Sequence, residues 1–112
     1  MDREEFRRHV RAALDLLPPE LAQALENVAV VVEDEDPDDP DLFGLYHGIP
    51  LPERGSAYSG ELPDRISIYQ LPLQDEFPDP DELVEEIRIT VLHELAHYFG
   101  IDEDRLAELG YE

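Results

Sequence analysis

Residues 93–97 read HELAH and place two imidazoles and one carboxylate within five positions. On a helix, residues four apart lie on the same face about one turn apart, so His93 and His97 can bind one metal ion together. Glu94 follows the first histidine and reaches the rim of that face, where it can accept a proton from a water molecule. The spacing predicts a metal centre with His93 and His97 as ligands and Glu94 as the catalytic base.

The absence of cysteine limits which ligands such a centre can use. It excludes disulfides, zinc fingers, iron–sulfur clusters and thiol catalysis. Two imidazoles and a carboxylate are a known catalytic ligand set for zinc, which we therefore expect as the cofactor. Gly100 ends the helix, and three carboxylates follow it in Asp102, Glu103 and Asp104. We expect one of these three to complete the site.

A second interpretation gives the two histidines no ligand role. His93 and His97 would then be ordinary histidines of a helix, hydrogen-bonded in the core or exposed at the surface. Three titratable side chains within a buried helix cost free energy unless they have partners. The apolar character of the segment around them therefore favours the metal centre.

The helix that must position this motif is well marked at both ends. Asp79 is a suitable N-cap, Pro80 suits the first helical position, and Glu82 completes a capping box. Gly100 is the expected stop, because glycine adopts a left-handed backbone without strain. Between these signals the apolar residues spread from one stripe to nearly all sides, which is typical of a helix that lies in the core.

Apolar periodicity predicts the elements on the N-terminal side. A helix begins after Asp2 and ends before Pro18, and a second, short helix follows. Residues 28–32 are a β-branched run and predict a buried strand. Residues 42–46 predict a short strand in which Gly44 marks a bulge or a point of close approach.

The segment from Arg65 to Gln70 alternates apolar and polar residues. Two isoleucines occupy one face, and Ser67 and Tyr69 occupy the other. This pattern predicts a half-exposed strand. Pro63 and Pro72 flank it, which indicates a protected sheet edge.

Two further segments are the acidic residues 33–41 and the C-terminal residues 102–109. Residues 33–41 read EDEDPDDPD and predict a solvated loop, with a weak cation site as the alternative. A last short helix is expected over residues 102–109. We find no internal repeat and expect a single domain over residues 1–112.

The charge balance excludes several partners. The chain has 112 residues, of which 8 are basic, all of them arginine, and 29 are acidic, for a net charge of −21. Such a surface repels phosphate, so neither nucleic acid nor an anionic membrane is an expected partner. It attracts divalent cations and basic peptides. A remaining alternative is an acidic decoy that mimics nucleic acid, in which the HELAH motif would be incidental.

The sequence also bears on location. We find no apolar stretch of about 18 residues, and the N-terminal ten residues have no apolar core of a signal peptide. We therefore expect a cytoplasmic protein.

The segment HELAHYFGIDEDRLAELGY, residues 93–111, resembles the signature of the minimal zincin-like metallopeptidases, a family of short bacterial proteins. The segments LFGLYHGIPLPERG and ELPDRISIYQLPL resemble the middle segments of that family. The resemblance implies an α+β fold, with a small twisted mixed sheet, a backing helix and the buried active-site helix.

The motif is also similar to the metzincin pattern HExxHxxGxxH/D. That pattern implies Glu103 as the third ligand, where the family usually has Asp, with Asp104 and Asp102 as alternatives. The resemblance also implies that a peptide or protein substrate pairs with an edge strand, which would be the strand from Arg65 to Gln70.

Together these features predict a zinc-dependent peptidase. A hydrogen-bond donor for the oxyanion is also needed, and the sequence offers Tyr98, Tyr111, Tyr58 and His47. The alternative is a zinc-binding regulatory protein of the same fold with little proteolytic activity. It is motivated by the shortness of the frame relative to larger zincins and by the acidic residue at the third-ligand position.

Overall fold

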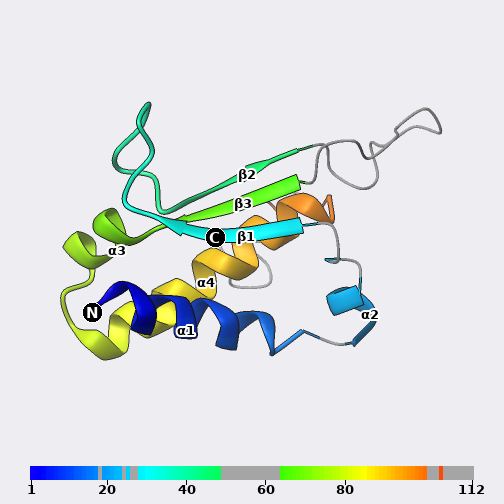
Figure 1. The fold of residues 1–112 in the computed structure, drawn as a ribbon, viewed down its shortest axis with the longest axis horizontal. Coiled ribbons are helices and arrows are strands. Elements are labelled where there is room, and N and C mark those ends of the chain that lie inside the picture. Colours follow the sequence, from blue (N-terminus) through cyan, green and yellow to red (C-terminus); the bar gives the residue numbers. More distant parts are fainter. Residues whose placement is uncertain (18, 24, 26–27, 49–63, 101–103, 105–112) are drawn as a thin grey trace.

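The computed structural model describes residues 1–17, 19–23, 25, 28–48, 64–100 and 104 (Figure 1). Four helices and three strands lie in this part of the chain. In order they are α1 (Arg3–Leu14), α2 (Pro19–Gln23), β1 (Val28–Glu33), β2 (Gly44–His47), β3 (Asp64–Tyr69), α3 (Gln70–Glu76) and α4 (Pro80–Tyr98). The α+β fold expected from the resemblance is confirmed.

The three strands form one mixed sheet in the order β1-β3-β2. β1 runs parallel to β3, with Val28 opposite Asp64, and β2 runs antiparallel to it, with Gly44 opposite Ile68. The prediction that the strand from Arg65 to Gln70 lies at a sheet edge is therefore wrong. This strand is central, and β1 and β2 occupy its two sides.

The prediction that this strand is half-exposed is also wrong, because Ser67 and Tyr69, which were expected on its exposed face, are buried with partners and only Arg65 is exposed. Ser67 is inaccessible to solvent, and its hydroxyl donates to Glu33 Oε1 at 2.9 Å. Tyr69 is 3% exposed, and its hydroxyl donates to Asp36 Oδ2 at 3.4 Å. Buried polar groups are tolerated where they are hydrogen-bonded, and alternation along one strand does not reveal such partners.

Asp36 lies in the acidic segment 33–41, which is mostly exposed, as expected. The Asp36 side chain is the exception, since it is only 7% exposed. It accepts the backbone N–H groups of Asp38 at 2.7 Å and Asp39 at 3.3 Å. These bonds make a local turn that Asp favours, and the loop is thereby fixed against β3 through Tyr69.

Helices α1 and α4 lie on the same side of the sheet (Figure 1). The predicted N-cap of α1 is confirmed, since Asp2 accepts the backbone N–H of Glu5 at 2.8 Å. Phe6 and Val10 face inward and belong to the same buried apolar cluster as residues of β3 and α4. The helix is amphipathic, so its opposite face carries arginines to the surface.

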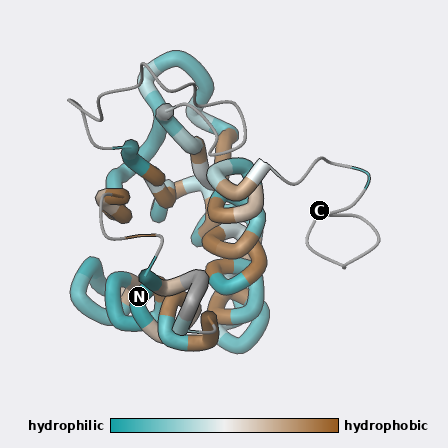
Figure 2. Tube along the Cα trace, turned by 90° about the vertical axis from the view of Figure 1, so that its right-hand side faces the viewer, coloured by the Kyte–Doolittle hydropathy of each residue, from teal (hydrophilic) through white to brown (hydrophobic). Residues whose placement is uncertain are grey.

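Helix α4 is the central element of the core and carries the HELAH motif. Asp79 caps it by accepting the N–H of Asp81 at 3.3 Å, with a proline in the first turn, as predicted. Gly100 follows its C-terminal end with a φ of 78°, which confirms the predicted stop. Its buried side chains lie on several sides, and Figure 2 shows brown apolar segments alternating with teal polar ones along the helices.

Helix α3 was not predicted from the sequence. It begins directly after β3, and Pro72 lies in its first turn. A proline is tolerated there because the first N–H groups of a helix have no partner within it. Pro72 therefore marks the start of a helix, and not only the end of a strand.

Two further predictions concern the C-terminal helix and membrane-spanning segments. The last short helix, residues 102–109, lies outside the described residues except for Asp104. Within the described part of the chain, the structure has no helix that is both long enough and apolar enough to span a membrane.

Candidate metal centre

The three residues singled out by their spacing come together on α4. The potential ligand atoms of His93, Glu94 and His97 all lie within 4.8 Å of one another. The two imidazole ring centres are 4.8 Å apart and the rings are inclined by 73°. Both histidines are partly exposed, whereas Glu94 is 8% exposed. Two imidazoles and one carboxylate therefore lie close together, and both imidazoles are accessible to solvent.

This geometry fits a metal ion. Zinc binds imidazole nitrogen at about 2.0–2.1 Å and commonly takes two histidines from one helix in catalytic sites. The donors come from adjacent turns of one rigid helix, so only side-chain rotations are needed to converge on a shared ion. His93 and His97 would hold the ion, and Glu94 is placed beside it.

A cavity of about 290 Å³ lies next to this group, between α4 and the start of β2. The α4 residues that line it are Glu86, Ile89, Thr90, His93 and Glu94. The residues that line its other side are Leu42, Phe43 and Gly44. Most of this lining is apolar, with carboxylates at two points. The cavity therefore offers space for an apolar side chain directly beside His93 and Glu94.

Gly44 explains how β2 comes so close to the site. A Cβ atom at this position would lie 3.0 Å from Thr90 Cγ2, 3.1 Å from Glu94 Cγ and 3.2 Å from the carbonyl oxygen of Ser67. Such distances are shorter than ordinary contacts, so any larger residue would push α4 or its side chains away. The predicted close approach at Gly44 is confirmed.

The proposed oxyanion donors have different surroundings. Tyr98 is 3% exposed, and its ring packs edge-on against Tyr46 with centres 5.9 Å apart. His47 follows Tyr46 in β2, and alternate strand residues point to opposite faces, so His47 points away from α4. Tyr58 and Tyr111 lie outside the described residues. The contacts of Tyr98 and the direction of His47 thus favour structural roles.

The third ligand is not among the residues that the structure brings together. Glu103 and its alternative Asp102 lie outside the described residues. Asp104 is described and exposed, and it does not belong to the His93–Glu94–His97 group. Glu103 therefore stays a prediction.

One polar pair behind the site was missed by sequence reasoning. Tyr46 donates its hydroxyl to Asp64 Oδ2 at 2.6 Å, and Asp64 is 4% exposed. A Cβ atom on Gly48 would lie 2.5 Å from Asp64 Cγ, so this pair also depends on a glycine. The pair fixes Tyr46, which packs against α4 next to the motif. Its two residues lie on different strands, and the sequence carries no local sign of their contact.

Comparison with known families decides the relationship. The family model described as zincin-like metallopeptidase matches residues 25–111. The chain belongs to this zincin-like metallopeptidase family. The match includes all three strands and all of α4, and it begins after α1 and α2. A comparison with curated proteins finds no match. The zincin-like family implies a metal, typically zinc, and the side chains of His93 and His97 fit one.

Proposed function

We propose that this protein is a zinc-dependent peptidase that hydrolyses peptide bonds. The observation that carries the proposal is the convergence of His93, Glu94 and His97 within 4.8 Å beside a cavity of about 290 Å³. His93 and His97 are the proposed ligands, with Glu103 as the third. The family relationship supports the same chemistry.

Glu94 is the proposed general base. Zinc, when bound, acts as a Lewis acid that lowers the pKa of a water molecule to about 7 and polarises the scissile carbonyl. Glu94 takes the proton of the attacking water and passes it to the amine nitrogen as the C–N bond breaks. Glu94 is 8% exposed, so the packing around its side chain limits its movement. With a metal bound, the other ring nitrogen of His93 and of His97 would be able to donate to a neighbouring acceptor, which would hold each ring in place.

The substrate is proposed to lie along β2. Within the described sheet both sides of β3 are occupied, whereas β2 is an outer strand and packs against α4. A peptide that pairs with β2 would pass over the cavity and Glu94, and one of its apolar side chains would enter the cavity. The net charge of −21 favours peptides with basic residues elsewhere in their sequence.

The test is a pair of glutamate-to-glutamine variants on the same helix. Glu94→Gln should retain one zinc per chain by elemental analysis, while cleavage of a broad peptide library falls by about 10²–10⁴-fold. Glu85→Gln is the control, because Glu85 is an exposed α4 residue paired with Arg88. It should cleave at the wild-type rate.

Each result separates the alternatives. Wild-type cleavage by Glu94→Gln would remove Glu94 from the mechanism. Full zinc binding without cleavage of any library peptide would favour a zinc-binding regulatory protein. Purified protein that binds no zinc, and whose binding of basic proteins competes with DNA, would favour the acidic decoy.

A further inference from the structure

The positive charge of this acidic chain is concentrated on one helix. Four of its eight arginines lie in the twelve residues of α1, at positions 3, 7, 8 and 11. Glu4 and Glu5 are the acidic residues of that helix, so α1 alone carries a net positive charge. Everywhere else the chain is strongly negative. An arginine cluster in such a chain is therefore a local exception to its field.

Arg3 has partners among the described residues, whereas Arg7, Arg8 and Arg11 have none, and of these three only Arg7 and Arg11 line a groove. Arg3 donates to Gln70 Oε1 at 2.6 Å and to the Val32 carbonyl at 2.9 Å, and it pairs with Asp34. Arg7 and Arg11 are exposed and form no ion pair or side-chain hydrogen bond within the described part of the chain. Their charges are available to a ligand.

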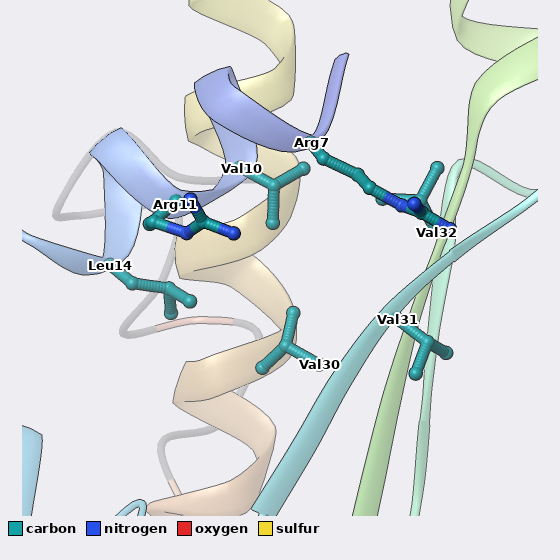
Figure 3. Close-up of a pocket in the computed structure, with 7 residues that line it drawn as sticks. All are labelled: Arg7, Val10, Arg11, Leu14, Val30, Val31 and Val32. Atoms are coloured by element: carbon teal, nitrogen blue, oxygen red, sulfur yellow. The ribbon is translucent and has the colours of Figure 1, made fainter. Parts of the chain in front are cut away.

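Arg7 and Arg11 line a groove between α1 and β1. The groove has a volume of about 290 Å³, and its α1 side consists of Arg7, Val10, Arg11 and Leu14. Its other side is residues 30–32 of β1. Figure 3 shows the Arg7 side chain extended from α1 toward Val32, with Val10 and Leu14 beside the two arginines. Two cationic groups thus stand over an aliphatic floor.

The β1 side of this groove is a strand edge. β1 is an outer strand of the described sheet, and its other side pairs with β3. The Val32 carbonyl accepts from Arg3 on α1, so it points away from β3. Backbone groups alternate in direction along a strand, so the N–H and carbonyl of Val30 also point away from β3. An extended chain can pair with them.

We propose that this groove binds an extended acidic segment of a partner protein, which adds to β1 as a fourth strand. Arg7 and Arg11 are four residues apart on a helix, so their Cβ atoms lie about 5–6 Å apart. Alternate residues of a strand are spaced by about 6.6 Å. Two carboxylates at alternate positions of the added strand therefore match the two guanidinium groups. The aliphatic floor contributes apolar contact and reduces solvent screening of the pairs.

The probe is a labelled ten-residue synthetic peptide with glutamate at alternate positions and threonine between them. Fluorescence anisotropy should detect its binding to the wild-type protein, although both molecules are acidic. Arg7→Glu and Arg11→Glu should each weaken binding by at least about tenfold, which corresponds to about 1.4 kcal/mol. Arg8→Glu makes the same charge change at a neighbouring exposed position that does not line the groove. It should weaken binding by less than about threefold.

Three controls test the folding of the variants, the strand hydrogen bonds and the independence of the groove from the metal centre. Circular dichroism establishes whether each variant folds. If Arg11→Glu does not fold, Arg11→Gln is used in its place. A peptide N-methylated at alternate residues loses its strand hydrogen bonds and should bind at least about tenfold more weakly. Binding should be unchanged by a zinc chelator and by Glu94→Gln, which separates the groove from the metal centre.

The following results would overturn the proposal. No binding, or equal losses for Arg8→Glu and Arg11→Glu, would overturn the groove as the site. Equal binding of the N-methylated peptide would overturn strand addition. Sedimentation that shows a wild-type dimer lost in Arg11→Glu would assign the groove to a second copy of this chain, and not to a partner protein.

Discussion

The backbone of Gly44 in β2 lies against the side chain of Glu94 in α4, with room for a hydrogen atom but not for a methyl group. A Cβ atom at position 44 would lie 3.1 Å from Glu94 Cγ. β2 is proposed to bind the substrate, and Glu94 is proposed as the base. The two lie this close together because residue 44 has no side chain. This contact is the structural link between substrate position and chemistry.

Gly44→Ala should impair catalysis more than zinc binding. The added methyl group must displace Thr90 or Glu94, since its third neighbour is the backbone carbonyl of Ser67. Overpacking of this kind costs about 1–3 kcal/mol of stability. We expect a lower turnover rate with one zinc retained per chain, as measured by peptide cleavage and elemental analysis.

A second substitution tests the cause. The nearest atom to the added methyl group is Thr90 Cγ2, at 3.0 Å. Thr90→Ser removes that atom and keeps the hydroxyl, so it should restore part of the turnover and stability in the Gly44→Ala background. A double variant no better than Gly44→Ala would place the strain elsewhere.

Zinc should stabilise the folded protein through His93 and His97. A ligand that binds only the native state, at one hundred times its Kd, adds about 2.7 kcal/mol. For a domain of this size that corresponds to a rise in Tm of about 10 °C. His97→Ala should lose most of this shift when scans with zinc and with chelator are compared. His9→Ala, a histidine substitution on α1 outside the metal-binding group, should keep it.

Tyr69 should make the stability fall at high pH. Its burial, followed by the nearby carboxylates of Asp36 and Glu33, raises the pKa of the Tyr69 hydroxyl above the ordinary value of 10.0. The unfolded chain therefore loses this proton first, so the contribution is complete below pH 10 and is lost as the pH rises through the folded-state pKa.

Urea unfolding at a series of pH values measures this effect. Above pH 10 the free energy of unfolding of Tyr69→Phe should decrease less steeply than that of the wild type. Asp36→Asn should reduce the slope by a smaller amount, because burial is the larger cause. Equal slopes for the wild type and Tyr69→Phe would contradict the assignment.

Local signals predicted the elements well. The cap at Asp2, the start of α4 after Asp79 and its stop at Gly100 each depend on residues adjacent in sequence. The β-branched run that became β1 and the glycine of β2 are local signals of the same kind. Helix α3 was missed because Pro72 reads as a terminator, although the first turn of a helix accepts it.

Strand order was not predictable from the same signals. The alternation in β3 is compatible with an edge strand or a central one, and the buried contacts of Ser67 and Tyr69 come from residues more than thirty positions away. The close grouping of His93, Glu94 and His97 could be predicted because all three belong to one helix. The cavity could not, since its two sides come from different parts of the chain.

The packing of α1 against α4 has a consequence for how the chain folds during synthesis. Phe6 and Val10 leave the ribosome early, but the residues that bury them, among them Ile87 and Val91, are made much later. Parallel pairing of β1 with β3 likewise waits for a strand that begins at Asp64. The N-terminal half therefore has little to fold onto until α4 has emerged. The core and the helix that carries His93 and His97 are thus completed together, late in synthesis.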